Sequence, residues 1–237
     1  MTSSNVADAL GHLRARLAEV AAETGRDPGS ITIVAVSKGV DDVRILEAKA
    51  AGIRCFGENK VQEGCRKQEA LGDAIPEWHL IGPLQANKVN KAVGRFTLLH
   101  GIDDADLVRR IGRRASMLGT TQRILLQVNV ARDPRKAGLD PEDTRSVVAV
   151  ARETPGVALE GFMTLAPQDV SEAEVSRAFR DLRRLRDELA PECPILSMGM
   201  SGDFELAIRE GATHLRIGSG IFGPRPTTQQ EAGANHG

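Results

Sequence analysis

The 237-residue sequence is short of several residue types that proteins use for chemistry. It contains no tyrosine, and its three cysteines, Cys55, Cys65 and Cys193, are odd in number and lack the spacing of a metal-binding motif. The five histidines form no H-x-x-x-H pair, so we expect no metal site. A small, odd number of cysteines is typical of a cytoplasmic protein, in which the thiols stay reduced.

The chain also lacks a dominant charge and a long apolar run. The formal net charge is -1, which gives no reason to expect a nucleic acid or an anionic membrane surface as a partner. No window approaches the roughly 20 apolar residues of a membrane-spanning helix, and the N-terminal region holds no apolar segment of the signal-peptide type. We therefore expect a cytoplasmic protein without a membrane or nucleic-acid partner. Since no long apolar helix is evident, we also expect a monomer.

What the sequence does contain is a regular alternation of strand-like and helix-like segments. Residues 5–23 have the apolar spacing of an amphipathic helix. Eight strand candidates follow, apolar on both faces, and a helix candidate comes after each of the first seven. The strand candidates are residues 31–36, 53–59, 77–82, 96–102, 121–130, 157–165, 193–198 and 212–223.

This alternation predicts an α/β fold. Strict strand–helix repetition indicates a parallel sheet, and eight repeats favour a closed (β/α)8 TIM-type barrel with an extra N-terminal helix. An open doubly wound sheet is the alternative. Single barrels run to roughly 200–250 residues, so we expect residues 1–226 to form one domain and residues 227–237 to form a disordered tail.

Lys38 stands where the first strand ends, in the stretch ITIVAVSKGV. Active groups of such barrels lie at the carboxyl ends of the strands. Lys38 shares a strand face with Thr32, Val34 and Val36. If that face is the barrel interior, loss of water would lower the lysine pKa from about 10.4 and free an amine that can form a Schiff base. A lysine that simply reaches water is the alternative.

Two segments near the end of the chain are suited to bind an anion. Ser201 precedes a probable helix and is a candidate N-cap, and Gly218, Ser219 and Gly220 follow the eighth strand with unobstructed N–H groups. Loops after strands seven and eight are the usual phosphate site of this fold. We therefore predict a bound phosphate there, although Ser201 alone would be explained equally well by a plain capped helix.

Barrel closure predicts which ligand carries that phosphate. Strand one neighbours strand eight, so the phosphate would lie beside Lys38. Pyridoxal 5'-phosphate (PLP) has an aldehyde and a phosphate-bearing arm on adjacent ring carbons, which fits this arrangement. Arg216, two residues before Gly218, could reach the pyridine nitrogen. A guanidinium keeps its proton, so that nitrogen would stay unprotonated and the ring would be a weak electron sink. A structural ion pair is the alternative for Arg216.

Several long motifs resemble those of a known family. These are VAVSKGV, FGENKVQEG, WHLIGPLQANK, GFMTLAP, LSMGMSGDFELAI and LRIGSGIFGPR, in this order between about Val6 and Pro226. They are similar to the signatures of the pyridoxal phosphate homeostasis proteins. The resemblance implies a single fold-type III PLP-binding barrel, like the N-terminal domain of alanine racemase, without a second domain.

The resemblance also implies roles for individual residues. Lys38 matches the lysine that forms the Schiff base, Asn59 lies beside the ring, and Arg216 faces the pyridine nitrogen. The phosphate ligands correspond to Ser201, Gly218 and Ser219, and the residues flanking the ring correspond to Ile81 and Met163.

Three further positions bear on the resemblance. Lys136 matches a second lysine implicated in the handling of other B6 vitamers, with an exposed loop lysine as the alternative. Lys60 stands where an aromatic residue is expected, and Arg135 replaces a small hydroxyl residue, which weakens the assignment of Lys136.

The resemblance implies a PLP carrier and regulator rather than an enzyme. Such a protein holds PLP on Lys38, supplies it to apo-enzymes and limits free PLP. The alternative is an amino-acid racemase of the alanine racemase type, whose second base is a tyrosine from an added domain. This sequence has no tyrosine, and Cys55 or His79 would have to replace it. A cofactor-free Schiff-base aldolase is a more distant possibility.

Overall fold

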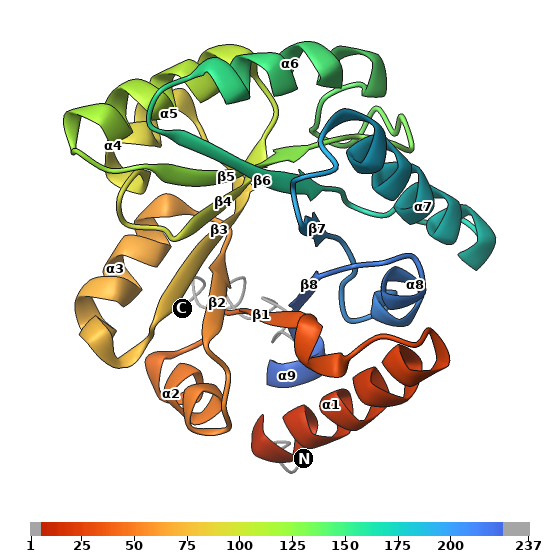
Figure 1. The fold of residues 1–237 in the computed structure, drawn as a ribbon. Coiled ribbons are helices and arrows are strands. Elements are labelled where there is room, and N and C mark those ends of the chain that lie inside the picture. The colour runs from red at the N-terminus through yellow and green to blue at the C-terminus, as the bar shows by residue number, and fades with distance from the viewer. Residues whose placement is uncertain (1–5, 225–237) are drawn as a thin grey trace, which may run out of the picture.

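The computed structural model describes residues 6–224, and within them eight parallel strands form a closed barrel in sequence order (Figure 1). The predicted barrel is therefore confirmed, and the open doubly wound sheet was the wrong alternative. The predicted 227–237 tail lies outside the described residues. The strands are β1 (Thr32–Val36), β2 (Cys55–Glu58), β3 (Glu77–Pro83), β4 (Leu98–Ile102), β5 (Gln122–Gln127), β6 (Val157–Met163), β7 (Ile195–Ser197) and β8 (His214–Ile217).

Helices surround the barrel and cover the outer face of the strands (Figure 1). Their bounds are α1 (Val6–Glu23), α2 (Asp42–Ala50), α3 (Val61–Leu71), α4 (Val89–Ala92), α5 (Ala105–Met117), α6 (Pro141–Glu153), α7 (Glu172–Leu189), α8 (Phe204–Arg209) and α9 (Ser219–Phe222). Three short 3-10 turns complete the described elements: η1 (Pro28–Ser30), η2 (Gly72–Ala74) and η3 (Ala86–Lys88). None of these helices is long and apolar enough to cross a membrane.

The extra helix α1 completes the outer layer. The helix that follows β8 is α9, which has only four residues and cannot cover the junction of β8 and β1. Helix α1 lies against α2, α8 and α9 and fills this position. Its apolar face, which includes Leu10 and Val20, is buried, and a fully buried side chain of this size contributes roughly 1.5–3 kcal/mol.

Closure of the barrel brings the two ends of the sheet together. Val34 of β1 pairs with Cys55 of β2 on one side and with Arg216 of β8 on the other. The segments that follow β1 and β8 therefore leave the barrel side by side, at the end where the carboxyl ends of the strands meet.

The barrel interior is less apolar than the strand sequences indicate. Two small apolar clusters lie inside it, one around Leu98, Leu125, Met163 and Ile195 and one around Val34, Cys55 and Ile81. The interior also holds buried polar side chains that are hydrogen-bonded to one another, namely His79, His100, Ser197 and Arg216. Burial of a polar group costs free energy unless the group is hydrogen-bonded, so these side chains need hydrogen-bond partners inside the barrel.

Candidate cofactor site at the carboxyl ends of the strands

A cavity of about 360 Å³ opens at the carboxyl ends of the strands. Five of the eight predicted cofactor residues line it: Lys38, Asn59, Ile81, Met163 and Arg216. They come from, or directly follow, β1, β2, β3, β6 and β8. Residues distant in the sequence thus meet around one space because parallel strands end together at the same rim.

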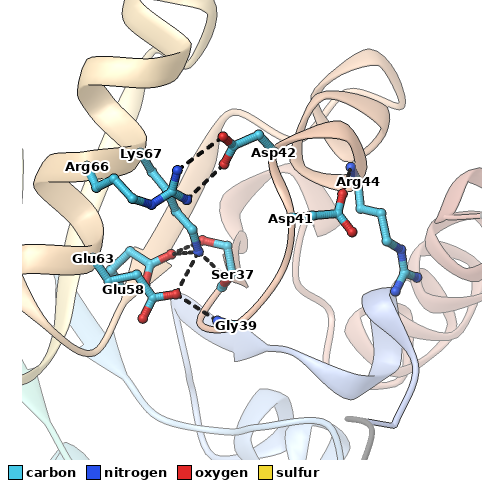
Figure 2. A network of polar contacts seen from close by, with 9 residues as sticks. All are labelled: Ser37, Gly39, Asp41, Asp42, Arg44, Glu58, Glu63, Arg66 and Lys67. Carbon is cyan, nitrogen blue, oxygen red and sulfur yellow. Dashed lines mark hydrogen bonds and ion pairs between the residues drawn. The ribbon is translucent and has the colours of Figure 1, made fainter.

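The backbone on either side of Lys38 is held by a buried polar cluster (Figure 2). Lys67 of α3 donates hydrogen bonds from Nζ to the Ser37 carbonyl oxygen at 2.6 Å, to Glu58 Oε1 at 2.7 Å and to Glu63 Oε1 at 2.9 Å. Ser37 Oγ donates to the same Glu58 oxygen at 2.6 Å. We call Ser37, Glu58, Glu63 and Lys67 the lysine cluster.

The residue after Lys38 is fixed by the same cluster. The N–H of Gly39 donates to Glu63 Oε1 at 2.7 Å, and Gly39 has a φ of 71°, a backbone conformation that favours glycine. Both peptide groups next to Lys38 are therefore anchored to α3. This arrangement limits the positions that the Lys38 side chain can take at the cavity rim.

Charge balance in the lysine cluster depends on burial. Lys67 is 1% exposed and Glu58 is fully buried. Burial raises the pKa of Glu58, and the hydrogen bonds from Lys67 and Ser37 oppose that effect. Burial would also raise the pKa of Glu63, but the N–H of Gly39 and Lys67 outweigh it and lower that pKa. The sequence analysis missed Lys67, whose only local signal is its i,i+4 spacing from Glu63.

Asn59 is placed by the close approach of β3 to the end of β2. A Cβ atom added to Gly82 would lie 2.4 Å from the Asn59 carbonyl oxygen, so only glycine fits at this position. Ile81 and Met163 are almost fully buried in the two interior apolar clusters and reach the cavity with an edge. The two residues that the resemblance places beside a ring therefore give the cavity apolar walls.

Arg216 is a buried cation whose hydrogen-bond partners are neutral. It is 4% exposed, and its Nη1 and Nη2 donate to Ser197 Oγ at 2.8 Å and to the Thr164 carbonyl oxygen at 2.9 Å. Burial lowers the pKa of Arg216 to about 10, which leaves it charged at neutral pH. Within the described residues no carboxylate forms an ion pair with it. A buried cation that lines a cavity and has only neutral partners fits a ligand with a lone pair or negative charge.

The three predicted phosphate residues lie beside the cavity rather than in its lining. Gly220 N–H donates to Ser201 Oγ at 3.1 Å, so the segments after β7 and β8 do meet as expected. The predicted N-cap role of Ser201 is wrong, because Ser201 lies in a turn and Asp203 is the N-cap of α8. Gly218 is the N-cap of α9, which begins at Ser219. The predicted eighth strand therefore ends at Ile217 instead of 223.

Lys136 lines the cavity, so the alternative of an exposed loop lysine is wrong. Its side chain is 12% exposed, and Nζ donates a hydrogen bond to the Ala166 carbonyl oxygen. Burial lowers the pKa of Lys136 despite the nearby Asp133 carboxylate. Lys60, by contrast, lies outside this cavity and lines an adjacent one together with Lys88.

Comparisons with known proteins show which family the chain belongs to. The family described as alanine racemase, N-terminal domain, matches residues 9–226. A pyridoxal phosphate homeostasis protein of Aquifex aeolicus is 40% identical over 225 residues, which cover 93% of this chain and 99% of that protein. One of Pseudomonas aeruginosa is 37% identical, with 94% and 96% covered. The chain belongs to the family of pyridoxal phosphate homeostasis proteins.

Solved structures extend the comparison beyond this family. PipY of Synechococcus elongatus, solved with PLP bound, is 38% identical to the chain and has a TM-score of 0.81, with 92% of this chain and 100% of that chain covered. D-threonine aldolase from Filomicrobium marinum is 14% identical with a TM-score of 0.75, and the match covers 60% of that enzyme. At this identity the likeness to the aldolase shows the barrel fold alone.

Proposed function

We propose that this chain binds PLP in the cavity at the carboxyl ends of the strands and holds it as a Schiff base on Lys38. It supplies PLP to apo-enzymes and keeps free PLP low, without catalysing a reaction of its own, as a monomer in the cytoplasm. The observation that carries the proposal is that Lys38 and the buried, neutrally partnered Arg216 line one cavity with apolar walls. The PLP-bound structure of the similar PipY supports it.

The residues present fit this cofactor. Arg216 would face the pyridine nitrogen, Ile81 and Met163 would flank the ring, and Asn59 would lie at its edge. The segments holding Ser201, Gly218 and Ser219, which meet through the hydrogen bond from Gly220 to Ser201, would receive the phosphate. Bound there, PLP would supply an electrophilic aldehyde carbon to the Lys38 amine.

A carrier role is favoured over a racemase because the tyrosine that serves as the second base in the racemase mechanism is absent. The sequence has no tyrosine. Cys55 and His79, the substitutes that we considered, lie in the barrel interior and do not line this cavity. Lys136 does line it, and we assign it to the binding of a second B6 vitamer rather than to proton transfer.

Borohydride reduction of the PLP-loaded protein, followed by peptide mass spectrometry, tests the Schiff base. We expect the reduced PLP adduct on Lys38 and its loss in Lys38→Ala, while Lys136→Ala, which changes another lysine of the same cavity, keeps the adduct. An adduct found on Lys136 instead, or none at all, would reject the assignment of Lys38.

Transfer of PLP to an apo-enzyme in the presence of a PLP scavenger tests the carrier role. Recovery of apo-enzyme activity despite the scavenger supports direct delivery, and loss of recovery indicates simple release. Steady turnover of D- or L-amino acids by the loaded protein would contradict the proposal and favour the racemase.

A further inference from the structure

A column of polar side chains runs through the barrel interior away from the cavity. Arg216 Nη1 lies 2.8 Å from Ser197 Oγ, which lies 2.9 Å from His100 Nδ1. His100 Nε2 lies 3.0 Å from His79 Nδ1. His79 Nε2 lies 3.7 Å from Glu77 Oε2, which is longer than a hydrogen bond. We call these five residues the histidine column.

The column connects the two ends of the barrel. Arg216 lines the cofactor cavity, whereas Glu77, the first residue of β3, lines a separate cavity of about 300 Å³ that it shares with Cys55. The members between them are inaccessible to solvent, with His100 and Ser197 both 0% exposed. The Glu77 side chain is 40% exposed. The column therefore begins at a buried cation beside the cofactor site and ends at a carboxylate in contact with water.

The chemistry of the two ends determines the direction of the hydrogen bonds. A guanidinium can only donate and an ionised carboxylate can only accept. Burial lowers the pKa of His79 and of His100, so each ring is neutral at pH 7 and carries one N–H. The contact with His79 lowers the pKa of Glu77, which keeps the carboxylate ionised.

One assignment of protons gives each hydrogen bond of the column one donor and one acceptor. Arg216 donates to Ser197 Oγ, the Ser197 hydroxyl donates to His100 Nδ1, and His100 Nε2–H donates to His79 Nδ1. His79 then carries its proton on Nε2, directed at Glu77. Both histidines are Nε2–H tautomers in this arrangement.

If the hydrogen bonds of the column ran in the opposite direction, two groups would lack a suitable partner. If His79 and His100 carried their protons on Nδ1, the Ser197 oxygen would accept from both His100 and Arg216. Its own proton would then have no acceptor among the described residues. The lone pair on His79 Nε2 would also face the carboxylate of Glu77, and two acceptors repel each other. His79 Nε2 has no hydrogen-bond partner among the described residues, and the carboxylate that faces it at 3.7 Å, Glu77, attracts an N–H at this position electrostatically.

We propose that Glu77 is a positioning residue for Arg216, acting through His79, His100 and Ser197. The carboxylate holds both histidines in the Nε2–H tautomer, which turns the Ser197 proton away from Arg216 and leaves the serine oxygen free to accept from it. Without Glu77 the histidines can exchange tautomers, and the Ser197 oxygen then accepts from both His100 and Arg216 while its own proton has no acceptor among the described residues, which weakens its hold on the guanidinium. The effect on PLP rests on the proposed function, whereas the column itself does not.

The same end of the barrel offers a competing assignment. Cys55, Glu77 and His79 have possible metal-ligand atoms within 4.8 Å of one another, although their spacing in the sequence predicts no metal site. A metal ion would need the lone pair of His79 Nε2, and that requires the unfavourable direction of the column. The positive charge of Arg123 also acts on His79. The structure therefore favours the hydrogen-bonded column over a metal site.

Long-range ¹H–¹⁵N NMR of the histidine rings in the full chain without PLP tests the column directly. We expect the Nε2–H tautomer for both His79 and His100 at pH 7, with signals assigned from His79→Gln and His100→Gln. An Nδ1–H tautomer at either ring would overturn the proposal. Addition of Zn²⁺ should leave the rings unchanged, and stoichiometric binding at His79 Nε2 would replace the column by a metal site.

Variants at Glu77 separate positioning from a general structural role. Glu77→Ala should leave mixed tautomers at His79, whereas Glu77→Gln, which keeps an oxygen acceptor, should restore the Nε2–H form. Glu160→Gln, which alters a partly exposed carboxylate that pairs with Arg123, should leave the tautomers of both rings unchanged. Unaltered tautomers in Glu77→Ala would show that Glu77 does not set the direction.

Binding of PLP gives a second, independent readout. Loss of one hydrogen-bonded partner is worth about 1 kcal/mol, so we expect Glu77→Ala to weaken PLP binding about fivefold and Glu77→Gln to weaken it less. Equal affinity in Glu77→Ala and wild type would contradict the positioning role. If wild type does not bind PLP, the proposed function fails, while the NMR result on the unliganded chain still decides the column.

Discussion

Two buried polar networks support two basic residues, Lys38 and Arg216, of the cavity at the carboxyl ends of the strands, and they do so by different means. The lysine cluster under Lys38 is ionic, with Lys67 enclosed between two carboxylates. The histidine column has only neutral side chains, those of Ser197, His100 and His79, between Arg216 and Glu77. The stability of an ionic cluster depends on the balance of its charges, whereas the stability of a neutral column depends on the direction of its hydrogen bonds.

The difference follows from where each network lies. The lysine cluster sits where α3 meets the turn after β1 and the end of β2, and there Glu63 is close enough to the surface to stay charged (Figure 2). The histidine column lies inside the barrel, where loss of water favours neutral groups. A charged group that is buried there needs a partner. For Arg216, the proposed ligand would be that partner.

Removal of Lys67 should have the largest effect. In Lys67→Met, Glu58 would lose its buried counter-charge, and we expect a loss of about 3–5 kcal/mol in the free energy of unfolding. Urea denaturation measures this change. Lys91→Met, at an exposed lysine, is the control. The double variant Glu58→Gln, Lys67→Met should regain part of the loss, and a double variant no more stable than Lys67→Met would show that charge balance is not the cause.

Ser197→Ala should break the histidine column at its centre. Arg216 would lose one acceptor and His100 would lose its donor, both in a fully buried position. We expect the free energy of unfolding to fall by roughly 2–3 kcal/mol, because a buried charged group is left short of a partner. Ser197→Thr, which keeps the hydroxyl, is the comparison, and equal losses in the two variants would indicate a packing effect instead.

Acid should destabilise the protein through its buried histidines. Burial lowers the pKa of His214, which stacks on His79, to about 3. The unfolded chain therefore binds more protons below its own histidine pKa of about 6.5, and stability falls as pH drops from there toward 3. Between pH 7 and pH 5 this residue accounts for about 2 kcal/mol of the loss.

His214→Gln tests that estimate by urea denaturation at both pH values. The variant should lose less stability than wild type over this interval. Glu63, whose lowered pKa matters only below the ordinary glutamate range, should not contribute there. The same pH dependence in wild type and variant would show that His214 is not kept neutral by the fold.

The exposed ion pair between Arg66 and Asp42 should matter least. It joins α3 to α2 at the surface next to the lysine cluster, with distances of 3.0 and 3.2 Å (Figure 2). Exposed pairs are screened by solvent and salt, so Arg66→Ala should leave the urea midpoint nearly unchanged. A large shift would mean that this surface pair, and not Lys67, holds the turn that carries Lys38.

The sequence predicts those features of the site that depend on local order along the chain. The position of Lys38 at the rim could be predicted because this residue comes at the end of an apolar strand. The direction of Arg216 could be predicted because side chains two positions apart on β8 share one face of the strand. Lys136 could not be placed in this way, since the path of its loop depends on contacts with Asp133 and Ala166. The role of Ser201 as an N-cap was wrong because the N-cap of α8 is Asp203, two residues later.

The sequence by itself determined the alternation of strands and helices, and with it the barrel and the end at which Lys38 emerges, because periodicity and strand termini are local properties. Only the tertiary structure decided that Lys67 lies beneath Lys38 and that Glu77, His79, His100 and Ser197 form a column to Arg216. These contacts join residues from different strands and helices. They arise from barrel closure and strand register, which bring together side chains that no spacing along the chain relates.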